Sequence, residues 1–243
     1  MKSLLFVIIV LLAGCAAGTI HGLANLALVE PFLDTAIGIE NQNLFLSGEE
    51  KDTPEFWTAY YDYRSWQKAG QILAGAILGT SVGALFGIVF VYSRKSLPGN
   101  SIKKALILAG LMFIAVYLIP FIKYPANPPT VGDPETVVFR GILYLSFTVI
   151  SGLAAVGFHK VYKRINKKYL AFVGYAGFIA AVFYAMPNNP DPITAPMTLV
   201  NDFRIMSAIG VSIFWASLGL IFGVLWHKIR PDKTQSESSS VTV

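Results

Sequence analysis

Long apolar runs alternate with short polar segments along the chain. Six runs stand out, at 4–28, 69–92, 105–122, 141–158, 170–186 and 205–226. Each is close to the length of about 20 residues that a helix needs to cross about 30 Å of hydrocarbon. The runs are continuous and lack the two-residue alternation of β-barrel strands. The pattern therefore predicts an all-α fold, a polytopic transmembrane helical bundle with six spans.

The composition agrees with a membrane protein. Of the 243 residues, 54% are hydrophobic and 14% are charged, whereas soluble domains have about 25% charged residues. This balance excludes an ordinary cytosolic globular protein. We expect one transmembrane domain over 1–230, with an outer loop at 31–68 that contains an amphipathic segment. The Ser- and Thr-rich end at 231–243 predicts a disordered cytoplasmic tail.

Basic residues gather on one side of the predicted bundle. Of the 19 Lys and Arg residues, 13 fall there: Lys2, Arg94, Lys95, Lys103, Lys104, Lys160, Lys163, Arg164, Lys167, Lys168, Lys228, Arg230 and Lys233. The positive-inside rule makes this side cytoplasmic, so both termini are expected in the cytoplasm and the protein in the cytoplasmic (cell) membrane. The outer side carries every acidic residue except Asp232 and Glu237. The net charge of +5 is thus an asymmetry across the membrane and does not predict nucleic-acid binding.

The single cysteine leaves two interpretations of the N-terminus. The stretch 12–15, Leu-Ala-Gly-Cys, resembles the cleavage box of a lipoprotein, in which Cys15 would become the lipidated first residue. However, 16–28 stays apolar where a lipoprotein normally has a polar tether, and the whole run is long enough to span. We therefore expect a first span in which Cys15 is a buried packing residue.

Three of the predicted spans begin at the outer side with an aromatic residue and an arginine. The junctions are Tyr63-Arg64, Phe139-Arg140 and Phe203-Arg204, each preceded by an acidic residue, namely Asp62, Glu135 and Asp202. We expect these acids to pair with the arginines. The recurrence predicts three helical hairpins of like orientation, a parallel repeat arrangement from which transporters are often built. The alternative is that each arginine simply reaches the lipid headgroups.

Two outer loops share the motif P-x-N-P, at 125–128 and 187–190. Proline removes a backbone donor and ends helices, so we expect Pro120 together with Pro125 to end the third span and Pro187 to end the fifth. The loops predict breaks that shape an outer gate, with Asn127 and Asn189 as candidate gate residues.

Glycines recur every four residues in the first two spans. The two series are Gly14, Gly18 and Gly22, and Gly75, Gly79, Gly83 and Gly87. Such small-residue faces let helix backbones approach closely. We expect these helices to pack against each other or against a partner.

A few polar residues in or beside the first span could carry chemistry. His21 and Asn25 lie four residues apart on one helix face, and Glu30, Asp34 and Glu40 follow in the amphipathic segment. Carboxylate and imidazole groups suit first-row divalent metals, and they also suit proton relays. The candidate metal ligands are therefore His21, Glu30, Asp34 and Glu40. The alternatives are a neutral His21 bonded to a carbonyl group, and carboxylates that are simply solvated.

Common catalytic motifs are absent from the sequence. It contains no phosphate-binding G-x-x-x-x-G-K-[ST] loop, no C-x-x-C and no H-E-x-x-H. We therefore expect a protein that is not an enzyme.

One long stretch resembles a known family. Residues 123–132 read Lys-Tyr-Pro-Ala-Asn-Pro-Pro-Thr-Val-Gly, and Pro134, Glu135, Thr136 and Arg140 follow. This run is similar to the CbtA family, described as cobalt-transporter subunits. Three other stretches are also similar to the family: Glu30-Pro31 with Ala36-Ile37 and Glu40, then Arg64 with Gln67 and Gly70, then Phe203-Arg204 with Ser207, Trp215, Gly219 and Gly223.

The resemblance implies a multi-pass membrane protein that takes up cobalt, with a small histidine-containing membrane subunit, CbtB, as its partner. Cobalt would be the transported substrate, and no resident cofactor is expected. Such families are usually described with five spans, whereas the pattern here gives six. We place the difference at the first span.

Three hypotheses for the function remain. The first is a permease subunit for uptake of a divalent transition metal, with Co2+ as the substrate. The second is a membrane scaffold or assembly subunit that does not transport, and the third is a lipid-acting membrane enzyme. A pore lined by unpaired arginines would instead favour an anionic substrate.

Overall fold

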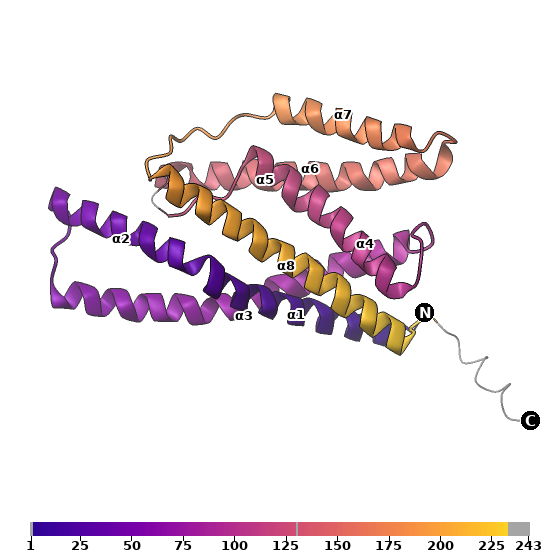
Figure 1. Ribbon diagram of the computed structural model, residues 1–243, viewed down its shortest axis with the longest axis horizontal. Coiled ribbons are helices and arrows are strands. Elements are labelled where there is room, and N and C mark those ends of the chain that lie inside the picture. Colours follow the sequence, from indigo (N-terminus) through magenta and orange to yellow (C-terminus); the bar gives the residue numbers. More distant parts are fainter. Residues whose placement is uncertain (1, 130, 233–243) are drawn as a thin grey trace, which may run out of the picture. The chain divides into compact units, whose positions relative to one another are not determined.

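The computed structural model describes residues 2–129 and 131–232, and all regular structure in these two stretches is helical. The elements, shown in Figure 1, are α1 (Ser3–Leu28), α2 (Glu30–Ser47), α3 (Pro54–Ser93), α4 (Ser101–Phe113), the π-helical turn η1 (Ile114–Leu118), α5 (Ile119–Lys123), the 3-10 turn η2 (Pro134–Thr136), α6 (Val137–Arg164), α7 (Tyr169–Ala185) and α8 (Met197–Ile229). The all-α prediction is confirmed.

Five of the described helical segments are long and apolar enough to cross a membrane. They are Ser3–Leu28, Pro54–Ser93, Ser101–Lys123, Pro134–Arg164 and Met197–Ile229. The first predicted span is among them, so placing the five-versus-six difference there was wrong. The segment that falls short is α7, which ends at Ala185 just before Pro187 and has 17 residues. Six spans and the three-hairpin repeat both stay predictions.

The predicted outer loop at 31–68 is mostly helical. Val29 separates α1 from α2, because Pro31 lacks the N–H that would continue the first helix. After Gly48 and a short loop, Thr53 caps α3 by accepting a hydrogen bond from the backbone N–H of Phe56. The 40 residues of α3 extend over about 60 Å, twice the thickness of a hydrocarbon core. Its first four turns therefore lie beyond the apolar stretch.

The chain forms two compact units. The first contains the described parts of Met1–Pro31, Asn43–Gly110 and Met206–Val243, and the second contains Phe32–Gln42 and Leu111–Ile205. The single transmembrane domain over 1–230 stays a prediction. Of the predicted tail, 233–243 lies outside the described residues.

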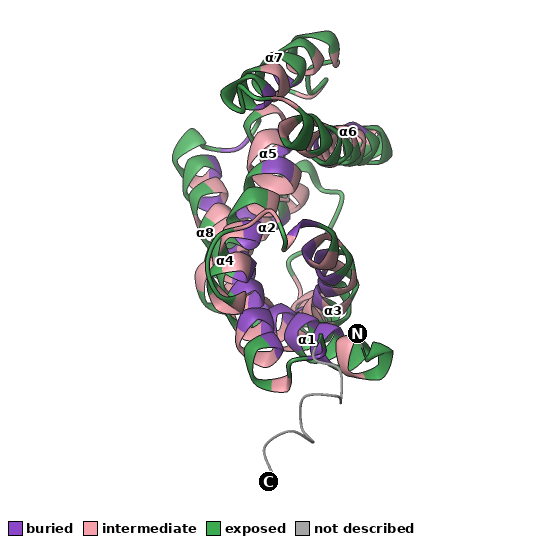
Figure 2. Cartoon of the chain, turned by 90° about the vertical axis from the view of Figure 1, so that its right-hand side faces the viewer, coloured by how far each residue is buried: buried purple, intermediate pink, exposed green. Residues whose placement is uncertain are grey.

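Large apolar side chains point outward on many helices. Examples with more than half of their surface exposed are Leu73, Ile77, Leu85 and Ile88 on α3, Leu145 and Leu153 on α6, and Phe172 and Val173 on α7. Figure 2 shows exposed residues over much of α6 and α7. A water-soluble protein rarely exposes large continuous apolar patches, whereas the surface of a membrane helix faces lipid. The exposure pattern supports a multi-pass membrane protein.

In the first unit, α1 and α3 pack along their glycine series. The Cβ of any side chain at Gly14 would lie 2.5 Å from the carbonyl oxygen of Gly79, and one at Gly75 would lie 2.6 Å from that of Gly18. Both distances are too short for a Cβ contact, so only glycine fits and the two backbones touch directly. Cys15 does not share this groove. Its side chain is exposed, so the expectation of a buried packing residue was wrong.

In the second unit, the π-helical turn η1 leaves one backbone carbonyl without its usual partner. A π-helical carbonyl accepts from the N–H five residues ahead, and for Ala115 that residue is Pro120, which has no N–H. The buried Ser151 hydroxyl of α6 instead donates to the Ala115 carbonyl at 2.5 Å, and it also contacts the Tyr175 hydroxyl at 2.8 Å. The third span thus continues through Pro120 and ends at Lys123, one residue beyond the predicted end at Ile122 and before Pro125.

Replacing Ser151 by alanine should therefore destabilise the second unit. The substitution leaves a buried carbonyl unsatisfied, which costs about 1–3 kcal/mol. The midpoint of thermal unfolding of the purified protein in detergent should fall for Ser151→Ala. Ser146→Ala, on the same helix at a partly buried position, is the control and should leave the midpoint unchanged. Equal midpoints for both variants would contradict this assignment.

Candidate functional site

A cavity of about 320 Å3 lies beside the two P-x-N-P loops of the second unit. Its walls are formed by Tyr117, Phe121, Tyr124, Pro125, Ala126, Asn127, Arg140, Leu143, Tyr144 and Asn189. Both candidate gate residues, Asn127 and Asn189, line this one cavity. It could hold about ten water molecules at ~30 Å3 each, or a small organic molecule.

Direct contacts tie the two loops to each other. The Tyr124 hydroxyl donates to the Pro187 carbonyl at 2.5 Å, and the Lys123 Nζ donates to Asn188 Oδ1 at 2.7 Å. Lys123 Nζ also lies 4.8 Å from the centre of the Phe183 ring, a cation–π distance. Burial raises the pKa of the Tyr124 hydroxyl, so it stays a proton donor at neutral pH. These contacts therefore hold the two loops of the cavity wall together.

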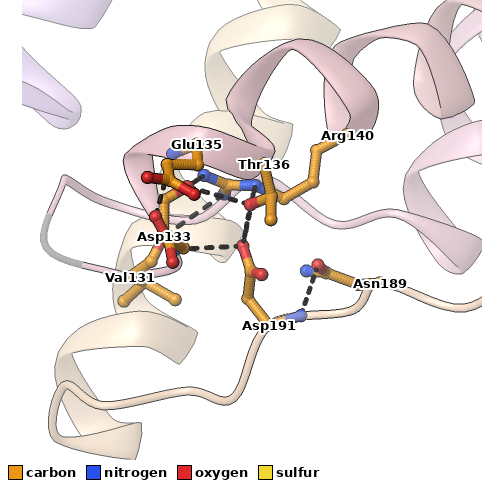
Figure 3. A network of polar contacts seen from close by, with 7 residues as sticks. All are labelled: Val131, Asp133, Glu135, Thr136, Arg140, Asn189 and Asp191. Atoms are coloured by element: carbon orange, nitrogen blue, oxygen red, sulfur yellow. Dashed lines mark hydrogen bonds and ion pairs between the residues drawn. The ribbon is translucent and has the colours of Figure 1, made fainter.

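Arg140 is held by a network centred on Asp191 (Figure 3). Asp191 Oδ2 lies 2.9 Å from Arg140 Nε, and it accepts from the Thr136 hydroxyl at 2.5 Å and from the Asp133 N–H at 3.1 Å. The guanidinium also donates to the backbone carbonyls of Val131 and Asp133. The charge of Arg140 is thus neutralised by a carboxylate, and each of its three side-chain nitrogens contacts an oxygen of the chain.

Gly132 is required for this network. Its φ angle is +97°, a region that favours glycine, and a Cβ there would lie 2.5 Å from Asp191 Oδ2 and 2.7 Å from Arg140 Nη1. No other residue leaves room for the ion pair.

The other two junction arginines have different partners. In the second unit, Arg204 Nη2 donates to Asn127 Oδ1 at 2.7 Å and Nε donates to the Ala126 carbonyl at 3.3 Å. In the first unit, Arg64 forms an ion pair with Glu30 in which both side chains are less than a tenth exposed. Arg64 also donates to Gln67 Oε1 at 2.7 Å. Glu30 begins α2, where the helix dipole favours a negative charge.

The predicted acidic partners of the arginines were therefore wrong. Asp62, Glu135 and Asp202 are all exposed, and the ion pairs of Arg64 and Arg140 are formed with Glu30 and Asp191. Asp62 and Asp202 lie two residues before Arg64 and Arg204 on the same helix, and residues at this spacing do not face each other. Glu135 lies in η2, where Asp133 caps its N–H.

Two of the four predicted metal ligands, His21 and Glu30, form contacts with other residues of the chain, and the other two lie further along α2. His21 lies with Nδ1 3.0 Å from the Gly210 carbonyl and Nε2 3.3 Å from the Asn25 amide, as the carbonyl-bonded alternative expects. Glu30 is paired with Arg64, while Asp34 and Glu40 follow along α2. Among the described residues, no three His, Cys, Asp or Glu side chains gather to hold a metal ion. Their role as ligands stays a prediction.

Sequence reasoning missed Asp191, Tyr117 and Tyr124. Asp191 follows the second P-x-N-P motif directly, and its N–H donates to Asn189 Oδ1 at 3.2 Å in an Asx turn. That local signal was present in the sequence. The position of Tyr117 depends on the π-helical turn, for which the sequence offers only the nearby Pro120.

Removing the charge of Asp191 should weaken the second unit. Asp191→Asn keeps the shape of the side chain but leaves Arg140 without its counter-charge, at an expected cost of about 1–3 kcal/mol for this partly buried pair. Thermal unfolding in detergent measures the loss. Glu135→Gln removes an exposed charge nearby and should leave the midpoint unchanged. A lower midpoint for Glu135→Gln than for Asp191→Asn would contradict this assignment and would favour the predicted pairing of Arg140 with Glu135.

Comparison with known proteins gives one match. A family model described as "Probable cobalt transporter subunit (CbtA)" matches residues 4–227. Neither the curated proteins nor the solved structures gave a match. The matched region covers nearly all of the five candidate spans of the described chain, both P-x-N-P loops and the whole cavity wall. The chain therefore belongs to the CbtA family.

Proposed function

We propose that this chain is the integral membrane permease subunit for uptake of a divalent transition metal, with Co2+ as the substrate. The observation that carries the proposal is the family match over residues 4–227, because its description names a cobalt transporter subunit. The outward apolar surfaces and the span-length helices support a position within the bilayer.

The electrostatics of the junctions are compatible with a cation. Three bare arginines would repel a divalent ion by about 1 kcal/mol per pair of unit charges at 4 Å in water, and by more in a lower dielectric. Glu30 and Asp191 cancel two of these charges at contact distance. Arg204 keeps its charge and binds neutral oxygens.

Two parts of the chain have proposed roles in transport. Asn127 and Asn189 form the gate, since both line the cavity beside proline-bounded loops. His21 and Glu30 act as ligands only if their contacts with Gly210 and Arg64 exchange for the metal. Such an exchange would couple metal binding to movement within the first unit.

The proposed setting follows from charge and family. The 13 basic residues on one side favour the cytoplasmic membrane with both termini inside. A small histidine-containing subunit of the CbtB type would supply further ligands. The scaffold alternative has lost some of its support, because the glycine faces that could recruit a partner are used for the contact between α1 and α3.

Uptake of radioactive cobalt into proteoliposomes tests the proposal. Vesicles with the purified chain, with and without the small subunit, should accumulate cobalt above the level of protein-free vesicles. Alanine substitution of His21 and glutamine substitution of Glu30 should each lower the rate at least about tenfold, which corresponds to about 1.4 kcal/mol.

The outcomes separate the proposal from its details. If wild type shows no flux under either condition, the permease function is wrong. If wild type transports and both variants transport equally well, only the assignment of His21 and Glu30 as ligands is lost.

A further inference from the structure

The two asparagines of the cavity wall present hydrogen-bond donors. Asn127 Oδ1 accepts from Arg204 Nη2 and Asn189 Oδ1 accepts from the backbone N–H of Asp191. A guanidinium and a backbone N–H can only donate, so the atoms that they contact must be the amide oxygens. Each side chain therefore keeps its NH2 group for another partner.

The hydroxyl of Tyr117 is a third polar group of the cavity wall that could bind a ligand. It is buried and has no hydrogen-bond partner among the described residues. Leaving a buried polar group unsatisfied costs about 1–3 kcal/mol, so the Tyr117 hydroxyl calls for a bound partner such as a water, an ion or a ligand. Tyr117 lies in the π-helical turn η1, a type of turn that is frequent at functional sites.

The charge of the wall favours an acceptor over a bare cation. Arg140 is its only residue with a formal charge, and the ten described wall residues include no Asp, Glu or His. Apart from the two asparagine amides and the tyrosine hydroxyls, the wall is aromatic or apolar, with Tyr117 and Phe121 stacked at 5.2 Å between ring centres. The divalent metals of this class are held mainly by carboxylate, imidazole or thiolate groups, and none of the ten wall residues supplies one.

From this chemistry we infer that the cavity binds a small carboxylate, and that the transported metal reaches it as a carboxylate chelate. The carboxylate oxygens would accept from the Asn127 and Asn189 amides and from the Tyr117 hydroxyl, beside the neutralised Arg140. The volume of about 320 Å3 lies at the lower end for small-molecule sites. The chelate part of the inference rests on the proposed function, whereas the carboxylate part does not.

Asn189→Asp distinguishes an anion site from a cation site. The aspartate keeps an oxygen for the Asp191 N–H, so the turn is preserved, but it replaces the NH2 donor by a negative charge. Binding of a carboxylate should fall by about tenfold or more, since a hydrogen bond to a charged group contributes about 1.5–3 kcal/mol. Binding of a bare cation should rise.

The measurement is equilibrium dialysis of the full-length protein in detergent, with radioactive citrate, radioactive cobalt chloride, or both together. Asn188→Asp is the matched control, since it introduces the same charge in the same loop at a residue outside the cavity wall. It should change citrate binding by less than about twofold. Tyr117→Phe should weaken citrate binding without lowering the melting midpoint, because its hydroxyl has no partner within the described chain to lose.

Each result supports or overturns the inference. Citrate retained only together with cobalt identifies the chelate as the ligand, and citrate retained equally without cobalt identifies the free carboxylate. No citrate retention, an unaffected Asn189→Asp, or cobalt held without citrate and more tightly by Asn189→Asp would each overturn it. If the protein transports cobalt salt but does not bind citrate, the permease function stands and the carboxylate inference is wrong. If it binds citrate but shows no cobalt flux, the permease function is wrong and the carboxylate site stands.

Discussion

The hydrocarbon core of a bilayer offers no hydrogen bonds, so each polar group within a span must find its partner inside the protein. This constraint explains the most specific contacts of the chain. Ser151 satisfies the carbonyl that the π-helical turn leaves open, and His21 contacts a backbone carbonyl. Beyond the apolar stretch, burial imposes the same need on Arg64, which is paired with Glu30. The same constraint leaves the outer faces of the helices apolar. Polar contacts thus fix the interior of the fold, and contact with lipid fixes the apolar character of its surface.

The sequence predicted the elements of the fold well. Hydrophobic runs at span length located the helices, and glycines at every fourth position marked the contact between α1 and α3. These predictions work because both signals are local and repeat along one helix. Span ends were less predictable. Pro120 lies inside a helical segment, since a π-helical turn and Ser151 absorb the break that a proline otherwise makes.

Partners across the fold could not be predicted in the same way. The acids adjacent to each arginine in sequence, such as Asp62, point to solvent, whereas the actual partners Glu30 and Asp191 lie tens of residues away. Nearness along a helix does not place two side chains on one face. The sequence identified part of the cavity wall, because the two P-x-N-P motifs singled out Asn127 and Asn189. Tyr117 could be added only once the three-dimensional path of the chain was known. Breaks in spans beside binding sites are common in transporters, and here the π-helical turn leads directly to the cavity wall.

The proposed transport path passes the cavity at the P-x-N-P loops. Chemical modification of one wall residue in intact cells tests this directly. Cys15, the single cysteine of the chain, is first replaced by serine, and Asn189→Cys or Glu135→Cys is then introduced, the latter at an exposed residue outside the cavity wall. A thiol reagent that cannot cross membranes should label both positions from outside, and it should block cobalt uptake only at Asn189→Cys. Uptake that persists after complete labelling of Asn189→Cys, or labelling that requires permeabilised cells, would contradict the account.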